Sequence, residues 1–356
     1  MSLATDVTVD PAPAVALTAR EPSGVAIIGV GHRLGSLIED NETLCRGLDI
    51  TPEWIIEKTG IERRYLAAED ESASSLSLAA ARQAMASAGV DASQIDLIVC
   101  CTFSADYRFP ALASKVHADL GVRGGQMLDV QANCAGFVTG LTVASDRMRL
   151  DDEIRNALVI GVELNSRFIS RTNADAAIYH SDGAGAVVLG RRPGSGVIAS
   201  AFHTDSSNYE AVRVRGGGST WTRPDRAFDE AIDTMELNGI ATWKQAITHL
   251  PGAIKKALRK SGLDQKDVDF FVFHQANLRL IEYLVRKMGA DMGSTFTNVQ
   301  RIGNTGAASV PIALSEAVEQ GRMDADDTVV IAAVGAGFNF GASVWRWVPV
   351  TAVPAA

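Results

Sequence analysis

The chain contains two copies of one structural unit, and this repeat constrains its fold more than any other feature. The segment AARQAMASAGVDASQIDLIVC, residues 80–100, aligns without gaps on AIKKALRKSGLDQKDVDFFVF, residues 253–273. The identical positions in this alignment include Gly89 with Gly262, Asp91 with Asp264 and Asp96 with Asp269. Two more segments match in the same order, NCAGFVTGLTVASDRM with GNTGAASVPIALSEAV and NALVIGVELNS with DTVVIAAVGAG. Amphipathic helices resemble one another by chance, but three collinear matches favour a duplication.

Apolar β-branched runs alternate with segments of helical periodicity, which predicts an α/β fold with a largely buried sheet. The expected strands are 25–30, 95–102, 157–162, 186–189, 270–273 and 328–334. The expected helices are 75–88, 137–149, 243–261, 278–287 and 307–320. The duplication divides the chain into similar halves, 24–192 and 196–349, after a Pro-containing disordered tail at 1–23. A site between such halves is the expected place for chemistry.

The composition argues against several classes of function. The 356 residues are 47% hydrophobic and 21% charged with a formal net charge of −9, and the lack of a long basic run disfavours nucleic-acid binding. The longest apolar stretch, 329–340, falls short of the roughly 20 residues of a membrane span, so no membrane insertion is expected. The four cysteines form no CxxC motif, which predicts neither disulfides nor a metal site and favours a reducing cytoplasm.

Cys134 is the candidate nucleophile. It follows an extended apolar segment and precedes a helix rich in small residues, and the backbone N–H groups and dipole of a helix N-terminus favour a thiolate. A small buried side chain is the alternative interpretation of such a cysteine. Cys45, Cys100 and Cys101 lack this position, and we expect them to be structural.

Two polar residues in the second half complete a candidate site. His274 ends the strand FFVFH, and functional groups of α/β folds lie at the carboxyl ends of strands. Asn304 occupies in the second half the place that Cys134 holds in the first, although GNTG is also a good turn and helix cap. Cys, His and Asn together supply a nucleophile and two hydrogen-bonding groups.

Two glycine-rich segments need separate consideration. Residues 332–343, AAVGAGFNFGAS, lack a dinucleotide fingerprint, and we expect either a turn that aims a backbone N–H at the site or a plain hairpin. Residues 181–190, SDGAGAVVLG, predict a tight turn into a strand, and Asp182 has no second acidic cluster with which to bind a metal.

Five motifs together resemble the β-ketoacyl-acyl carrier protein synthase III family of the thiolase superfamily. They are EWIIEKTGIERR from Glu53, CAGF at Cys134, DGAGAVVL from Asp182, HQANLR from His274 and GNTGAASVP from Gly303. The likeness covers residues 25–347. It implies a thiolase-like, five-layered αβαβα fold made of two similar halves, and a homodimer.

The resemblance also implies a reaction. Cys134 would be the acylated nucleophile, His274 and Asn304 would support decarboxylation, and the N–H groups of Cys134 and Ala336 would form the oxyanion hole. The reaction would be a decarboxylative Claisen condensation of an acyl thioester with a malonyl thioester, in fatty acid, polyketide or specialised metabolism. The thioesters, carried by coenzyme A or acyl carrier protein, would need no further cofactor.

The positions that resemble substrate contacts depart from the family pattern in several places. Trp54 matches an adenine-stacking aromatic residue and Lys58 stands in place of an Arg, but Ala174 occupies the place of the second stacking Arg, so the carrier of the acyl group stays open. His180 and Val334 replace an apolar and a bulky aromatic pocket residue, which predicts a remodelled acyl pocket.

Other positions match the family's contacts with partners. Phe109 matches a residue that reaches the partner's acyl pocket across the dimer interface, and Asn277 matches a polar contact of the pantetheine arm. Arg279, Arg286 and Lys287 resemble the basic patch that receives the acidic carrier protein, although a solvated helix face would look the same.

Two other functions remain open. The first is transfer of the acyl group from Cys134 to an alcohol, an amine or another carrier without condensation, which needs a base but no enolate support. The intact Asn304 therefore favours condensation. The second is a catalytically silent dimer partner, which the retention of all three polar residues disfavours.

Overall fold

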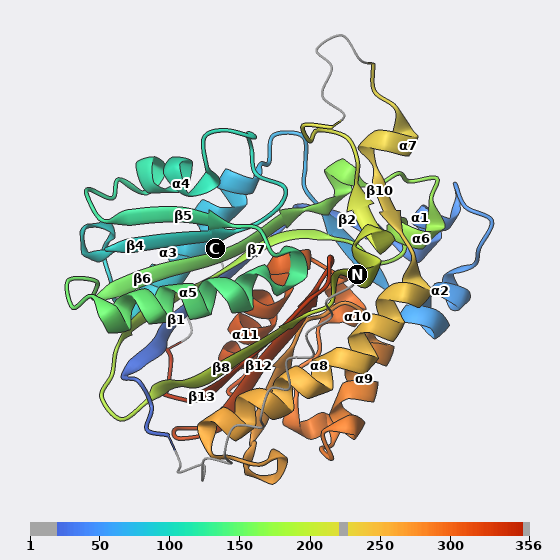
Figure 1. The fold of residues 1–356 in the computed structure, drawn as a ribbon. Coiled ribbons are helices and arrows are strands. Elements are labelled where there is room, and N and C mark those ends of the chain that lie inside the picture. Colours follow the sequence, from blue (N-terminus) through green and yellow to red (C-terminus); the bar gives the residue numbers. More distant parts are fainter. Residues whose placement is uncertain (1–19, 221–226, 352–356) are drawn as a thin grey trace, which may run out of the picture.

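The computed structural model describes residues 20–220 and 227–351, which form two main sheets, each drawn from one half of the chain (Figure 1). The first sheet has the order β1-β7-β6-β4-β5 and the second the order β11-β12-β13-β8. The strands of the first sheet are β1 (Val25–Leu34), β4 (Leu97–Cys101), β5 (Gln126–Val130), β6 (Asn156–Leu164) and β7 (Asp182–Arg191). Those of the second are β8 (Gly196–Thr204), β11 (Phe270–Phe273), β12 (Thr328–Gly335) and β13 (Asn339–Arg346).

Helices and sheets alternate in five layers, which confirms the expected thiolase-like αβαβα fold. Helices α3 (Ala73–Ala88) and α4 (Leu112–Leu120) cover the outer face of the first sheet. Helices α5 (Gly136–Leu150) and α11 (Ser309–Glu319) lie between the sheets, and α8 (Gly239–Ser261) with α9 (Leu278–Lys287) lies on the outer side of the second sheet (Figure 1). The core is divided accordingly, with one apolar cluster around the middle helices and one beneath each outer helix pair.

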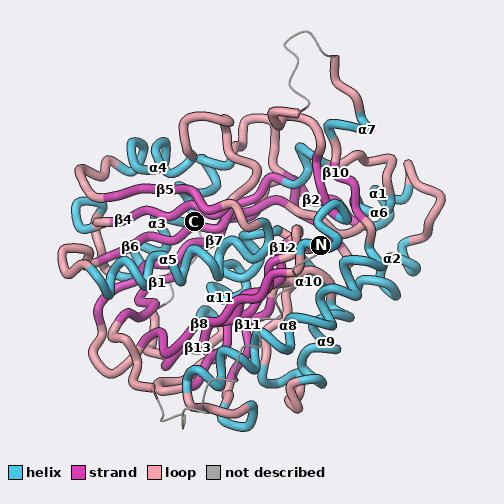
Figure 2. Tube along the Cα trace, in the orientation of Figure 1, coloured by secondary structure: helices cyan, strands magenta, loops and turns pink. Residues whose placement is uncertain are grey.

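Most of the shorter helices and strands lie to one side of the two main sheets (Figure 2). Two small antiparallel pairs are β2 (Leu37–Asp40) with β3 (Arg63–Leu66) and β9 (Val212–Val214) with β10 (Met235–Leu237). The short helices are α1 (Asn41–Cys45), α2 (Pro52–Thr59), α6 (Ala174–Ala177), α7 (Glu230–Asp233) and α10 (Val299–Ile302).

The matched positions of the repeat occupy equivalent places. Gly89 and Gly262 both end their helices in the left-handed conformation, with φ of 65° and 71°. Such backbone suits glycine, since a Cβ would be strained there. Asp96 accepts hydrogen bonds at the start of β6, and Asp269 accepts one at the start of β12. The strand pairings repeat as well, with β4–β6 and β11–β12 parallel and the following pairs antiparallel.

Several expectations differ from the structure at their edges. The predicted disordered tail is too long, because Arg20 donates to the carbonyl of Ser261 and Ser23 to that of Val197, while residues 1–19 lie outside the described residues. The segment 181–190 is part of strand β7 rather than a turn into one. The glycine-rich segment 332–343 forms two paired strands joined at 336–338, in agreement with the hairpin alternative, whereas strands β5 and β8 were not predicted.

Within residues 20–220 and 227–351, no helix is long and apolar enough to cross a bilayer. No group of three His, Cys, Asp or Glu side chains in that same part of the chain could hold a metal ion. Asp182 instead accepts hydrogen bonds from the N–H groups of Ala67 and Ser166, so its carboxylate connects three segments of the fold.

Gly161 and Gly252 provide a matched test of the packing between the two halves. A Cβ on Gly161, in strand β6, would lie 2.4 Å from the carbonyl oxygen of Ala307 in the other half, whereas one on Gly252, in helix α8, would meet nothing. We therefore expect Gly161→Ala to lower the free energy of unfolding by about 1–3 kcal/mol. Gly252→Ala should raise it by about 0.5–1 kcal/mol, because alanine is the better helix former. Denaturant titration measures both, and equal effects of the two substitutions would contradict this account of the interface.

Candidate active site

A single pocket brings together residues from both halves of the chain. It is lined by Cys134 from the first half and by His274 and Asn304 from the second. The other predicted residues that line it are His180, Asn277, Val334 and Ala336. The structure therefore brings seven of the predicted residues together at one pocket.

Cys134 lies in a short 3-10 turn, Asn133–Ala135, directly before helix α5. The preceding residue, Asn133, has a φ of 49°, and its side-chain amide donates to the carbonyl of Ala336 over 3.0 Å. A Cβ on Gly335 would lie 2.3 Å from the carbonyl oxygen of Ala132, so only glycine allows the two segments to approach this closely. The turn that contains Cys134 and the glycine-rich turn are thus held close together.

Burial controls the protonation of Cys134. Burial, together with the smaller effect of the nearby Glu163 carboxyl, raises the pKa of the thiol to about 12. The helix start favours the thiolate, as the sequence indicated, but the net shift in this pocket has the opposite sign. Cys134 is therefore a thiol at neutral pH, and a neighbouring group must take its proton when it attacks a substrate.

His274 follows strand β11, and its backbone N–H donates to the carbonyl of Ala332 over 2.9 Å. Its Nδ1 lies 2.5 Å from the hydroxyl oxygen of Ser309, the first residue of α11. Burial lowers the pKa of the imidazole to about 3, with a further contribution from His180. The ring is therefore neutral, and a hydroxyl partner can stabilise either tautomer since it both donates and accepts.

Asn304 is held by its backbone and by one end of its side chain. Its N–H donates to the carbonyl of Tyr179 over 2.8 Å, and its carbonyl accepts from the N–H of Ser181 over 2.8 Å. Its Oδ1 accepts from the N–H of Gly306 over 2.9 Å. Because the amide oxygen is committed in this way, the side-chain NH₂ is the group available for a ligand.

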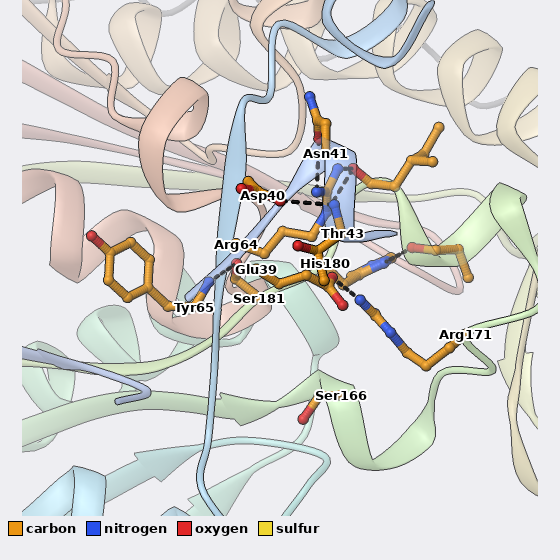
Figure 3. A network of polar contacts seen from close by, with 12 residues as sticks. Glu39, Asp40, Asn41, Thr43, Arg64, Tyr65, Ser166, Arg171, His180 and Ser181 are labelled. Atoms are coloured by element: carbon orange, nitrogen blue, oxygen red, sulfur yellow. Dashed lines mark hydrogen bonds and ion pairs between the residues drawn. The ribbon is translucent and has the colours of Figure 1, made fainter. Parts of the chain in front are cut away.

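The same backbone pairing places His180 beside Asn304. His180 Nδ1 lies 2.9 Å from the carbonyl oxygen of Ala176, and burial lowers the pKa of the ring to about 4. Arg64 lies behind it, fully buried, with its guanidinium bonded to the carbonyl of Ile178 and to Oδ1 of Asn41 (Figure 3). Arg64 belongs to the EWIIEKTGIERR motif, but its burial could not be derived from a charged run.

Glu163 was missed by the sequence interpretation. It is fully buried at the end of β6 and accepts hydrogen bonds from the hydroxyl groups of Thr102 and Ser104 and from the N–H of Phe103. Burial raises the pKa of this carboxyl to about 8, against the effect of these donors. The only signal in the sequence was an acidic residue inside an otherwise apolar strand, which is costly unless the residue is well bonded.

Of four further residues predicted to contact substrate, one lines the pocket and three do not. Asn277 lines the pocket and caps α9, since its Oδ1 accepts from the N–H of Arg279 over 2.7 Å. Trp54 and Lys58 lie on α2, outside the pocket lining, with the Lys58 ammonium 4.4 Å from the Trp54 ring centroid. Phe109 also lies outside the lining and is 88% exposed.

The three predicted docking residues have unequal surroundings. Arg279 donates to the carbonyls of Glu57 and Ile56 and pairs with Glu282, so it fastens α9 to the end of α2. Arg286 and Lys287 lie at the other end of α9 and are exposed. Of these three side chains, Arg286 and Lys287 are the two without a hydrogen-bond or ion-pair partner among residues 20–220 and 227–351, as expected of a docking patch.

Comparisons with known proteins agree with this fold and site. Residues 128–206 match the family model of 3-oxoacyl-[acyl-carrier-protein] synthase III, and residues 258–347 match that of its C-terminal part. The β-ketoacyl-[acyl-carrier-protein] synthase III of Rhodospirillum centenum is 39% identical over 92% of this chain and 100% of its own length. The chain belongs to the β-ketoacyl-acyl carrier protein synthase III family.

Solved structures support the same assignment. The 3-oxoacyl-[acyl-carrier-protein] synthase III of Aquifex aeolicus superposes with a TM-score of 0.84 at 30% identity, covering 91% of this chain and 100% of that one. The priming β-ketosynthase of the R1128 polyketide pathway superposes with a TM-score of 0.84 at 27% identity, covering 95% and 100%. The protein is thus a condensing enzyme of the type found in fatty acid and polyketide synthesis.

The raised pKa of Cys134 predicts how its reactivity depends on pH. A thiol that is protonated at neutral pH gains thiolate about tenfold per pH unit, so its alkylation by iodoacetamide should rise by about that factor per unit between pH 7 and 9. Peptide mass spectrometry can follow Cys134 separately from Cys45, which is partly exposed on α1. A plateau in the Cys134 rate below pH 8 would show instead that the helix start outweighs burial.

Proposed function

We propose that Cys134 accepts an acyl group from a thioester and that His274 and Asn304 support the decarboxylation of a malonyl thioester, whose enolate then attacks the acyl-cysteine. The observation that carries this proposal is the meeting of Cys134, His274 and Asn304 in one buried pocket between the halves. The product is a 3-oxoacyl thioester. The proposed steps use the chain's own residues and the two thioesters.

In the first half-reaction, the Cys134 thiol gives its proton to the neutral His274 ring as its sulfur attacks the thioester carbonyl. The N–H groups of Cys134 and Ala336 stabilise the oxyanion, and the link between Asn133 and the Ala336 carbonyl supports this role because it fixes the two segments together. Collapse of the intermediate breaks the bond to the leaving thiol, which takes the proton from His274. The acyl group is then held on Cys134.

In the second half-reaction, the malonyl carboxylate leaves as carbon dioxide and its electron pair forms an enolate. Donors from the His274 ring and the Asn304 side-chain NH₂ stabilise the enolate oxygen. The enolate carbon attacks the acyl carbonyl and expels the Cys134 thiolate, which takes up a proton. The Ser309 hydroxyl supports both half-reactions, since it can accept from or donate to His274 Nδ1 as the ring changes tautomer.

A second candidate is acyl transfer to an alcohol, an amine or another carrier without condensation. The observation that favours it is the altered surface of the donor site. Ala174, at the start of α6, has no side chain that could stack on the side opposite Trp54, and His180 places a second imidazole next to His274. In this reaction His274 serves as the base and Asn304 has no enolate to stabilise.

The partners follow from exposed residues. The 88% exposed Phe109 favours a homodimer in which this ring is covered by the second copy, since a large aromatic side chain so exposed is unusual. Arg286 and Lys287 favour docking of an acidic acyl carrier protein on a chain whose net charge is −9. The few cysteines of the sequence, which form no CxxC motif, support a location in the reducing cytoplasm.

Variants of Asn304 should separate the two half-reactions. We expect Asn304→Ala to leave acylation of Cys134 nearly unchanged and to lower malonyl decarboxylation by about 10² or more, the usual effect of removing one preorganised donor. Asn304→Asp keeps an acceptor for the Gly306 N–H but has no NH₂, so it should fail in the same step. Intact-protein mass spectrometry measures loading, with Cys134→Ala as the unloaded control, and released carbon dioxide measures decarboxylation.

The result would decide between the candidate functions. Wild-type turnover of a malonyl thioester by both Asn304 variants would exclude condensation and favour simple acyl transfer. Recovery in Asn304→Asp alone would assign Asn304 a purely structural role in holding the Gly306 turn.

Charge reversal on α9 tests carrier docking. Arg286→Glu with Lys287→Glu should raise KM for a carrier-bound substrate through slower association, and leave turnover of a short pantetheine thioester unchanged. The effect should shrink above about 0.5 M salt, where screening is strong. The matched control reverses Arg82 and Arg155, two exposed cations of the first half. Equal losses with both substrates, or in the control, would place the docking surface elsewhere.

A further inference from the structure

His180 is a buried polar side chain in the reaction pocket that the proposed steps do not use. It is 6% exposed, it lines the pocket with Cys134 and His274, and its backbone pairs with that of Asn304. The backbone pairing therefore fixes the position of His180 in the pocket. Its ring can contact a group that is bound there.

The hydrogen bond of His180 determines its tautomer. A carbonyl oxygen only accepts, so the contact of 2.9 Å with Ala176 requires that Nδ1 carries the proton. Nε2 then has a lone pair and no proton, and among the described residues it has no hydrogen-bond partner. This differs from His274, whose hydroxyl partner allows both tautomers.

The surroundings of His180 keep it neutral. Burial is the main cause that lowers the pKa of its ring to about 4, and the positive charge of Arg64 adds to the effect. Arg64 is itself fixed, because its guanidinium is fully buried and bonded to Asn41 and to the carbonyl of Ile178, two residues before His180 (Figure 3). The ring is therefore neutral near pH 7, and with the proton on Nδ1 its Nε2 is a hydrogen-bond acceptor.

The pocket also contains the polar side chains of Tyr179, Thr242 and Asn304, but among the described residues none of them donates to Nε2. Its wall includes the apolar side chains of Val212, Leu237, Ala246, Leu280, Val334 and Phe338. A plain alkyl chain in this pocket would exclude water from Nε2 without replacing its hydrogen bond, and a buried acceptor left without a partner is unfavourable. A substrate that brings its own donor avoids this cost.

We propose that the enzyme is selective for acyl groups that carry a neutral hydrogen-bond donor, a hydroxyl or an amide N–H, which His180 Nε2 accepts in the acyl pocket. This inference rests on the proposed acylation of Cys134 and names the substrate class of the same site. This role would account for a histidine at a position where the family pattern has an apolar residue. An apolar side chain there would contact an alkyl chain without leaving a hydrogen-bond acceptor unpaired.

The test compares matched acyl thioesters of one pantetheine mimic. For each chain length, an alkanoyl thioester competes with analogues that carry a hydroxyl at successive carbons and with an analogue that carries an amide N–H. Intact-protein mass spectrometry reports which group is loaded on Cys134. Contacts with the pantetheine arm are common to all members, so they cancel in the comparison.

We expect the wild-type enzyme to load at least one donor-bearing analogue about tenfold or more faster than the matching alkanoyl group. His180→Phe should abolish or reverse this preference while it still loads alkanoyl groups, and His180→Gln, which retains an acceptor, should keep part of it. The matched control is His203→Phe, an exposed histidine outside the pocket, which should behave as wild type.

The outcomes separate this inference from the function on which it rests. Loading of Cys134 without preference for a donor, or a preference that persists in His180→Phe, would overturn the role of His180 and leave the acylation intact. Absence of loading by every thioester would overturn both. The selectivity of the wild-type protein decides the matter even if His180→Phe fails to fold.

Discussion

The backbone pairing between Asn304 and the segment Tyr179–Ser181 is the interaction on which the site depends. It joins a loop of the second half to the strand entry of the first half through two hydrogen bonds of 2.8 Å. It fixes Asn304 and His180 side by side, and it brings Asn304 into the pocket that contains Cys134 and His274. The side chains of His180 and Asn304 take their positions from this paired backbone.

Both copies of the repeat contribute to the pocket, since Cys134 lies in the first half and His274 and Asn304 lie in the second. Cys101 and His274 occupy equivalent positions of the repeat, yet they have different surroundings. A Cβ on Gly140 of α5 would lie 2.4 Å from the Cys101 sulfur, so that helix covers Cys101 completely. His274 faces Ser309 at the start of α11 and opens onto the pocket. The same framework thus supports a packed core at one position and a reactive group at its equivalent.

The sequence predicted those parts of the structure that depend on local patterns. The repeat, the helices with clear periodicity and the three residues Cys134, His274 and Asn304 all follow from spacing and motif. The burial of Glu163 and Arg64 could not be predicted in this way. A strand pattern or a charged run does not show that one ionisable group in it is buried, nor which distant atoms form hydrogen bonds with that group. Trp54 and Lys58 form a cation–π pair with each other outside the pocket lining, and their contact with substrate stays a prediction.

Burial gives the pocket its electrostatic character. It raises the pKa of Cys134 to about 12 and lowers those of His274 and His180 to about 3 and about 4, so all three groups are neutral near pH 7. Among the described residues that line it, the pocket therefore contains no ion pair that would compete with a reacting oxygen for its donors. Charge develops there only when a proton moves or carbon dioxide leaves, and at that point fixed donors act in surroundings of low polarity, where they are strongest. A neutral pocket therefore stabilises the transition state, in which charge develops. A pocket with an ion pair would instead use its donors to stabilise the resting enzyme.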